Sequence, residues 1–242
     1  MKTDLVIFDK DGTLIDVHYY WCGMIELRAK RLVKDCVGIS QRKLAAKELM
    51  ENMGIDLPHR KIKLNGPVGI KPREFIVNSA YQTMRKYCPT ITIEQVLLVF
   101  EEVDKYSKNH LNTLVRPLYG AESLLKHLKR NDIKVAIATT DLTKRAQLAM
   151  EGAGLLQYFD IIAGSDVVEK AKPSPDLVNY VRNKLSISIE KTVVVGDSIV
   201  DLDMATSAQV GFIGVRTGLH SLEFLQRSRV LVDDLSQVKD LL

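Results

Sequence analysis

The chain has 242 residues, of which 46% are hydrophobic and 26% charged, so it can bury a sizeable core and is not expected to be disordered. The net charge of +4 is small and dispersed, which argues against a nucleic-acid-binding protein. The three cysteines form no C-x-x-C pair and predict neither a zinc site nor a disulfide framework. The sequence contains no apolar run of roughly 18 residues and no signal-peptide pattern, so we expect a soluble cytoplasmic protein that does not bind membranes.

The first predicted strand is the apolar run LVIF at residues 5–8, which leads directly into the sequence DKDGT. Similar β-branched runs follow at 135–139, 160–164, 192–196, 211–215 and 229–232. Uninterrupted apolar strands are typical of a parallel sheet that is covered on both faces. Helical patterns alternate with these strands from residue 117 onward, for example at 119–132, where Ala121, Leu124, Leu125 and Leu128 share one face. This order predicts a doubly wound α/β sheet.

Residues 17–115 interrupt that alternation and predict only helices, at roughly 22–37, 40–53, 72–87 and 92–109. Thr92 and Gln95 form a capping-box pattern at the start of the last helix. About a hundred residues is far longer than an ordinary crossover, so we predict an inserted helical domain at 17–115 and an α/β domain built from 1–16 and 116–242. The insertion holds sixteen Lys and Arg against ten Asp and Glu, which indicates either solvated helix surfaces or a surface that attracts an anionic substrate.

Ligands of open α/β sheets bind beyond the carboxyl ends of the strands, and chemically active residues follow several of the predicted strands. Asp9 and Asp11 follow the first strand, and Asp197 and Asp201 follow the fourth. The other candidates are Thr139, Thr140 and Asp141 after the second strand and Lys172 in a loop before a helix. Clustered carboxylates repel one another unless a cation lies among them, and hard oxygen ligands favour Mg²⁺.

Four motifs, DKDGTLID, VAIATTD, KPSPD and VVVGDSIVDLDMA, occur in this order, with the helical insertion directly after the first. In this combination the chain resembles the haloacid dehalogenase superfamily of phosphatases, in particular the phosphoglycolate phosphatase-like members with a helical cap domain between the first two motifs. The resemblance implies a Rossmann-like core and an all-helical cap. It also implies Mg²⁺-dependent hydrolysis of a small phosphorylated metabolite through an aspartyl-phosphate intermediate.

By this resemblance Asp9 is the nucleophile, and Asp11 is the general acid for the leaving alcohol and then the general base for water. The implied Mg²⁺ ligands are Asp9, Asp11 and Asp197; for Asp11 this role competes with acid catalysis, which requires its carboxyl group to lie off the metal. Asp201 is expected to orient Lys172 or a metal-bound water. The residues expected to contact the phosphate group are Gly12, Thr13, Thr139, Thr140 and Lys172.

Three further residue interpretations leave alternatives open. Lys10 stands where the family usually has an apolar residue; if strand geometry continues through position 10 its side chain points away from the pocket, with a salt bridge to a neighbouring acid as the simplest role. Asp141 is interpreted, by a small margin, as the N-cap of a helix that begins near Thr143. In the loop NGPVGIKPREF, residues 65–75, Lys71 and Arg73 are candidates for substrate specificity, against the alternative that they are merely solvated.

Other functions remain possible on the sequence. A phosphomutase of the same superfamily is the closest alternative. A haloacid dehalogenase is disfavoured because it lacks a second acid such as Asp11, and a phospho-receiver signalling module is disfavoured by the length and the large insertion. We expect a small-molecule partner, no nucleic acid, and a monomer or homodimer.

Overall fold

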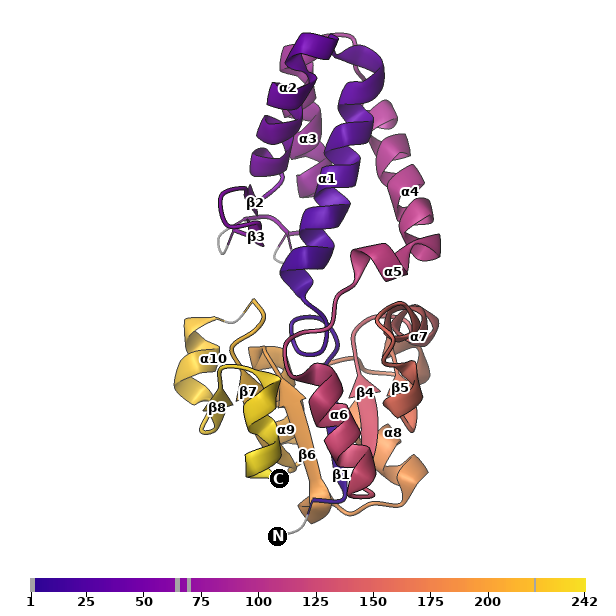
Figure 1. Ribbon diagram of the computed structural model, residues 1–242, viewed down its shortest axis with the longest axis vertical. Coiled ribbons are helices and arrows are strands. Elements are labelled where there is room, and N and C mark those ends of the chain that lie inside the picture. The colour runs from indigo at the N-terminus through magenta and orange to yellow at the C-terminus, as the bar shows by residue number, and fades with distance from the viewer. Residues whose placement is uncertain (1–2, 64–65, 69–70, 220) are drawn as a thin grey trace. The chain divides into compact units, whose positions relative to one another are not determined.

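The computed structural model describes residues 3–63, 66–68, 71–219 and 221–242, and the chain divides into two compact units. The first unit combines Met1–Val17 with Val115–Leu242, and the second is His18–Leu114. Figure 1 shows the sheet of the first unit and the helices of the second.

The first unit is built on a six-stranded sheet in the order β5-β4-β1-β6-β7-β8, with parallel pairing throughout. Its strands are β1 Leu5–Phe8, β4 Lys134–Ala138, β5 Ile161–Ala163, β6 Thr192–Gly196, β7 Gly211–Val215 and β8 Leu231–Val232. Each of the six predicted strands is confirmed to within two residues at either end. Strand β1 lies in the middle, where Leu5 pairs with Lys134 of β4 and with Thr192 of β6. A residue that follows β1 is therefore flanked by residues that follow two other strands.

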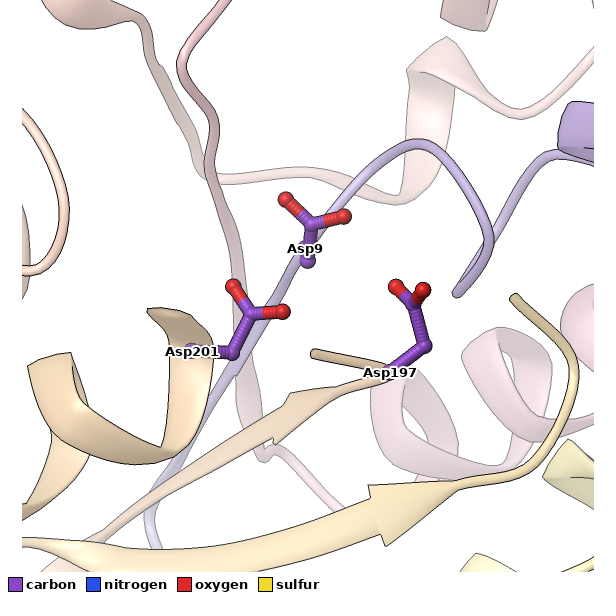
Figure 2. Close-up of side chains that lie close together, drawn as sticks. All are labelled: Asp9, Asp197 and Asp201. Atoms are coloured by element: carbon purple, nitrogen blue, oxygen red, sulfur yellow. The ribbon is translucent and has the colours of Figure 1, made fainter. Parts of the chain in front are cut away.

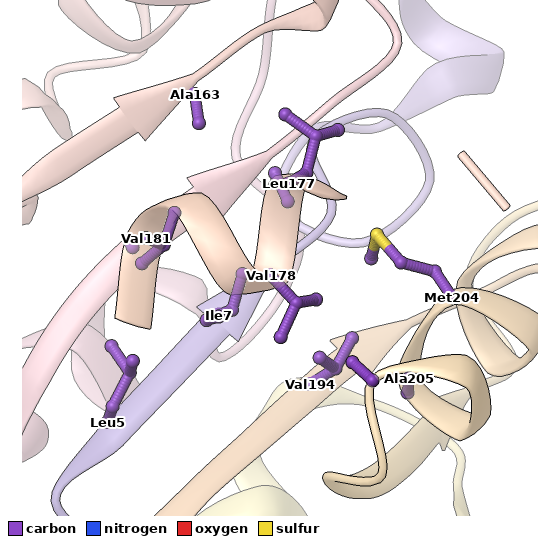
Figure 3. Close-up of a cluster of buried hydrophobic side chains, with 12 residues drawn as sticks. Leu5, Ile7, Ala163, Leu177, Val178, Val181, Val194, Met204 and Ala205 are labelled. Carbon is purple, nitrogen blue, oxygen red and sulfur yellow. The ribbon is translucent and has the colours of Figure 1, made fainter. Parts of the chain in front are cut away.

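Helices cover both faces of this sheet, as a doubly wound fold requires. The helices are α6 Ala121–Arg130, α7 Thr143–Gly152, α8 Asp176–Leu185, α9 Ile199–Ser207 and α10 Leu222–Arg227, with 3-10 turns η1 Leu156–Tyr158, η2 Ser165–Val167, η3 Ile189–Lys191 and η4 Leu235–Leu241. Helices α8 and α9 bury Leu177, Val178 and Met204 against strand residues such as Ile7 and Val194 (Figure 3). Helix α6 lies on the opposite face (Figure 1) and buries the apolar stripe that its sequence predicts.

The second unit contains the four expected helices, α1 Val17–Cys36, α2 Ile39–Asn52, α3 Arg73–Tyr87 and α4 Ile93–Asn109, followed by the short α5 Leu111–Leu114. The capping box of Thr92 and Gln95 is confirmed at the start of α4. One addition to the helical pattern is an antiparallel hairpin of β2 Ile55–Asp56 and β3 Lys61–Ile62. Its strands have only two residues each, too few for any periodicity to appear in the sequence.

The longest helix of the described residues, α1, spans 20 residues but carries Arg28, Lys30, Arg31 and Lys34. Within residues 3–63, 66–68, 71–219 and 221–242, the structure has no helix with both the length and the apolar character needed to cross a bilayer.

Candidate active site

The three central strands β4, β1 and β6 end at the same edge of the sheet, and a polar residue follows each of them. Thr139 follows β4, Asp9 follows β1 and Asp197 follows β6. The N–H of Asp9 donates to the carbonyl of Val195 at 2.9 Å, which extends the pairing one residue beyond the strand. The register of the parallel sheet thus brings side chains from distant parts of the sequence to one place.

Three carboxyl groups meet at this edge, and we call Asp9, Asp197 and Asp201 the acidic group. Each contributes an oxygen that lies within 4.8 Å of the others, and Figure 2 shows the three carboxyl groups gathered in one place. Asp197 is 5% exposed and Asp201 is 1% exposed. Asp201 is fixed on α9 by a capping box, in which the N–H of Ser198 donates to Asp201 Oδ2 at 3.2 Å and the N–H of Asp201 donates to Ser198 Oγ. Ser198 Oγ also donates to Asp201 Oδ2 at 2.5 Å.

A buried lysine connects two members of the acidic group. Lys172 Nζ donates to Asp9 Oδ1 at 2.5 Å and to Asp201 Oδ1 at 2.6 Å, and its side chain is 2% exposed. Burial alone would lower the pKa of Lys172, but the carboxylates of Asp201 and Asp9 outweigh it and raise the pKa above its ordinary value. The lysine therefore stays charged and offsets part of the negative charge.

The acidic group keeps an excess of negative charge even with this lysine. Burial raises the pKa of Asp9, Lys172 partly offsets the rise, and Asp201 adds to it, so that the pKa reaches about 6. Burial, followed by the charges of Asp9 and Asp201, also raises the pKa of Asp197 well above its ordinary value. Protons stay on these carboxyl groups at a pH where exposed aspartates are ionised, because the proton relieves the repulsion.

The carboxyl group of Asp197 accepts a hydrogen bond from Thr13 and fits into space that two glycines, Gly12 and Gly218, leave open. Thr13 Oγ1 donates to Asp197 Oδ1 at 2.9 Å. A Cβ atom at Gly12 would lie 2.5 Å from Asp197 Oδ2, and one at Gly218 would lie 1.7 Å from it. Thr217 Oγ1 donates to the carbonyl of Gly12 at 2.6 Å and ties the two loops together. The N–H of Gly12 is itself donated within its own turn, so Gly12 contributes space for Asp197 rather than a donor.

Thr217 and Gly218 are absent from the residues predicted from sequence, although a usable signal exists. Both residues come directly after Val215 and Arg216, at the carboxyl end of β7. The rule that located Asp9 and Asp197 applies equally to that strand end. The sequence prediction covers only polar residues after the first, second and fourth strands, and a glycine acts here through the side chain that it lacks.

Asp11 lies outside the acidic group and has a different partner. Its carboxylate Oδ2 accepts a hydrogen bond from Lys10 Nζ at 2.5 Å, and its side chain is 42% exposed. Strand β1 ends at Phe8, so the condition under which Lys10 would point away from the pocket is not met. Instead the carbonyl of Lys10 accepts the N–H groups of Leu14 and Ile15, which forms a tight turn. The expected salt bridge to a neighbouring acid is present, and the acid is Asp11.

The loop after β4 differs from the prediction in the role of Asp141. Helix α7 begins at Thr143, whose N–H donates to Asp166 Oδ1 at 2.7 Å. The interpretation of Asp141 as the N-cap is therefore wrong, because Leu142 occupies the N-cap position and Asp141 Oδ1 accepts the N–H of Leu142, which precedes the helix. Asp141 Oδ2 instead lies 3.4 Å from Lys10 Nζ. Thr139 is buried and its Oγ1 accepts the N–H of Asp141 at 3.2 Å, while Thr140 is exposed.

Lys71 and Arg73 belong to the second unit, and the loop at 65–75 that contains them is described only in part, since 65, 69 and 70 lie outside the described residues. Arg73 forms an ion pair with Asp104 and lies 5.7 Å from the centre of the Phe100 ring. Lys71 Nζ lies 5.9 Å from the centre of the Phe75 ring. Both side chains are exposed, and Arg73 has a partner within its own unit.

The acidic group has the properties of a site for a hard divalent cation. Its ligands would be carboxylate oxygens, and three carboxylates face one ammonium, so a dication would balance the remaining charge. The raised pKa values of Asp9 and Asp197 report the same excess of negative charge. The residues therefore fit a metal ion such as Mg²⁺.

We expect Gly218→Ala to weaken divalent-cation binding by about tenfold or more, since the new methyl group must displace the Asp197 carboxylate. The affinity can be measured by calorimetric titration of the metal-free protein with Mg²⁺. Gly38→Ala is the matched control, because a Cβ at Gly38 meets nothing within 4 Å. Equal affinity of the Gly218→Ala and wild-type proteins would show that Asp197 does not bind the cation.

We also expect the metal-free protein to lose stability as pH rises from about 5 to about 7.5. The folded pKa of Asp9, about 6, lies above the ordinary 3.8, so the folded state holds more protons than the unfolded chain in this range. The melting temperature in EDTA should fall by about 5 °C, and Mg²⁺ should reduce the fall because it replaces the protons. Asp197→Asn should also reduce it, whereas Asp203→Asn should not. A melting temperature in EDTA that rises over this range would contradict the expectation.

The comparisons with known proteins agree with this geometry. The model of the haloacid dehalogenase-like hydrolase family matches residues 3–209. The protein of Dickeya dadantii named probable phosphatase IndB is 35% identical over 121 residues, which are 49% of this chain and about half, 53%, of that protein. A phosphoglycolate phosphatase of Pseudomonas fluorescens is 28% identical over 246 residues, covering 97% of this chain and 78% of that protein.

A solved structure extends the likeness to the fold of the whole chain. The crystal structure of a predicted phosphoglycolate phosphatase from Haemophilus somnus covers 100% of this chain and 98% of its own, with a TM-score of 0.69 and 20% identity. At this identity the likeness concerns the fold. The family match spans most of the sequence and includes the acidic group, which confirms the resemblance of the motifs: the chain belongs to the family of haloacid dehalogenase-like hydrolases.

Proposed function

We propose that this protein is a Mg²⁺-dependent phosphatase that hydrolyses a phosphate monoester of a small metabolite. The observation that carries the proposal is the position of Asp9, which directly follows the central strand β1 and lies beside a buried ammonium and two further carboxyl groups. The family match and the phosphatase names of the relatives support the same activity.

Asp9 is the proposed nucleophile. Its carboxylate oxygen would attack the phosphorus atom, and the bond from phosphorus to the leaving oxygen would break, which leaves an aspartyl-phosphate. Lys172 donates to Asp9 Oδ1, so it can orient the carboxylate and also oppose the charge of an incoming phosphate group. Water would then attack the same phosphorus atom, and the Asp9 carboxylate would be released with inorganic phosphate.

Asp11 is the proposed proton donor and acceptor. It would give its proton to the leaving oxygen in the first step and take a proton from the attacking water in the second. An acid in this role must be free to reach the leaving oxygen and must not bind the metal. The position of Asp11 outside the acidic group suits this role better than the competing role as a metal ligand.

The remaining residues would hold the cation and the phosphate group. Asp9, Asp197 and Asp201 are the carboxyl groups that would surround Mg²⁺, which when bound would supply positive charge against the phosphate oxygens. Asp201 also fixes Lys172. Thr139 stands at the end of β4, on one side of Asp9, and we assign it, with Thr13 and Thr140, to the phosphate oxygens.

We further propose that residues 17–115 form the cap domain of this family and contribute to the choice of substrate. Lys71 is the better candidate of the two cations predicted for this role, because Arg73 is already paired with Asp104. The surplus of basic residues in this segment would favour a substrate with more negative charge than the phosphate group alone carries.

The decisive experiment is the release of inorganic phosphate from a panel of phosphoglycolate, sugar phosphates and nucleotides. The wild-type protein should release phosphate from at least one of them, and Asp9→Asn should lower kcat by at least about a thousandfold because an amide is a poor nucleophile. Asp203→Asn, which changes an aspartate of α9 outside the acidic group, is the control. Conversion of a sugar phosphate into its isomer without phosphate release would instead identify the alternative, a phosphomutase.

Metal dependence can be tested on the same assay. Activity should be lost in excess EDTA and return with Mg²⁺, while Ca²⁺ should inhibit because it takes more ligands at longer distances. Beryllium fluoride should also inhibit as a phosphoryl mimic. Full activity in EDTA would show that the acidic group serves another purpose.

A further inference from the structure

Lys10 is a second buried ammonium at the edge of the sheet, and the mechanism above gives it no role. Its residue is only 5% exposed, in a turn whose residues Thr13, Leu14 and Ile15 are also buried, and it lies next to Asp11, whose side chain is 42% exposed. The carbonyl of Lys10 accepts N–H groups from Leu14 at 3.0 Å and Ile15 at 2.9 Å. The backbone of Lys10 is thus fixed, and its side chain starts from a defined point.

The ammonium of Lys10 lies between two carboxylates from different loops. It is 2.5 Å from Asp11 Oδ2 and 3.4 Å from Asp141 Oδ2. Asp141 is anchored in turn, because its N–H donates to Thr139 Oγ1 and its Oδ1 accepts the N–H of Leu142 at 2.9 Å. Arg145 Nε also lies 3.4 Å from Asp141 Oδ2. The loop after β4 therefore provides a fixed support for Lys10.

Direct binding of substrate by Lys10 does not fit these contacts. Its side chain is 6% exposed, and its ammonium already faces two carboxylates, so a phosphate oxygen would have to displace one of them. A purely structural salt bridge does not account for the arrangement either. Exposed ion pairs add little stability, and burying an ammonium is costly unless it is well paired. Instead, Lys10 donates its hydrogen bond to Asp11, the carboxyl group that transfers protons in the proposed function.

We propose that Lys10 is a positioning residue that holds the Asp11 carboxyl group in the orientation required for proton transfer. The proposal rests on the proposed function, in which Asp11 protonates the leaving oxygen. A half-exposed aspartate in a turn can adopt several rotamers, and the charge of Asp11 is repelled by Asp9 two residues away. A hydrogen bond from a lysine that is itself held by Asp141 selects one of these rotamers. The orientation of the Asp11 carboxyl group affects the rate of proton transfer to the leaving oxygen directly.

An apolar residue at position 10 could not provide this hydrogen bond. The hydrogen bond from Lys10 to Asp11 therefore depends on the lysine of this chain. It predicts that the effect of Lys10 on the rate depends on the leaving group of the substrate. Substrates whose leaving oxygen needs a proton should depend on Lys10. Substrates whose leaving group departs as a stable anion should not, because their first irreversible step needs no acid.

The test compares kcat/KM of Lys10→Met on two substrates, the preferred alkyl phosphate of the panel and p-nitrophenyl phosphate. Methionine keeps the unbranched side chain and removes the ammonium. We expect a loss of about tenfold or more on the alkyl phosphate and a change within about twofold on p-nitrophenyl phosphate. Lys10→Arg, which restores a cationic donor, should recover part of the loss. Lys144→Met, which removes an exposed lysine of α7, is the matched control and should change neither value.

Asp141→Asn provides an independent variant that keeps Lys10 and removes the negative charge of its support. Asp141→Asn should lower kcat/KM for the alkyl phosphate by a smaller factor than Lys10→Met does, and should leave kcat/KM for p-nitrophenyl phosphate within about twofold. Equal losses on both substrates in Lys10→Met, with no recovery in Lys10→Arg, would overturn the proposal in favour of a structural role, as would unchanged kinetics in both Lys10→Met and Asp141→Asn.

Failure of the proposed function has a different outcome. If the wild-type protein hydrolyses neither substrate, the proposed phosphatase activity is wrong and the role of Lys10 is overturned with it. If Asp11→Asn fails to show the same preference for p-nitrophenyl phosphate, Asp11 is not the acid and Lys10 has nothing to position.

Discussion

Electrostatic repulsion among three carboxyl groups at one sheet edge is the constraint that organises the rest of the first unit. Asp9, Asp197 and Asp201 are placed within 4.8 Å of one another by two adjacent strands and one helix. Left alone, such a group destabilises the fold, since buried like charges have little water to screen them. Lys172 offsets part of the repulsion, and a proton or a cation must supply the remaining positive charge. The folded state therefore requires additional positive charge at this edge, which a bound divalent cation would supply.

The surrounding structure shows how this strained arrangement is maintained. Strands β1 and β6, which Asp9 and Asp197 follow, are paired on both sides within the sheet and are covered by α8 and α9 on one face. Asp201 is fixed by the first turn of α9, through Ser198. Gly12 and Gly218 leave room for a carboxyl group where any side chain would collide with it. The packing of the apolar core stabilises the fold enough to keep the three carboxyl groups of the acidic group close together, despite their mutual repulsion.

Local sequence patterns predict the parts of the molecule that local forces determine. The strands were predictable because β-branched runs mark buried parallel strands, and the capping box of Thr92 was predictable because its partners are three residues apart. The meeting of Asp9 with Asp197 followed from the topology of a parallel sheet, and the family motifs indicated the same strand ends. The hairpin of β2 and β3 was not predictable, because two-residue strands leave no pattern.

The turn that contains Lys10 and the partners of Asp141 were not predictable, for a different reason. Both depend on where the strand stops and on which distant loop supplies the next hydrogen bond. The period of two along a strand says nothing about a side chain in the turn that follows it. Asp166 takes the N–H of Thr143 from 23 residues away, and no local rule identifies such a partner.

Asp9 and Asp11 show how two identical side chains, two residues apart, can have different chemistry. The side chain of Asp9 is 13% exposed and shares Lys172 with Asp201, inside the acidic group. The side chain of Asp11 is 42% exposed and pairs with Lys10, outside the acidic group.

Each carboxyl group thus has its own lysine, and each lysine is fixed by a further aspartate, Asp201 for Lys172 and Asp141 for Lys10. The first pair keeps a carboxylate oriented within a site that favours a cation, whereas the second keeps a carboxyl group in contact with solvent, where protons are exchanged. In the proposed function, the sequence DKD separates the nucleophile from the proton carrier, because the turn after Phe8 brings the lysine to the second aspartate rather than to the first.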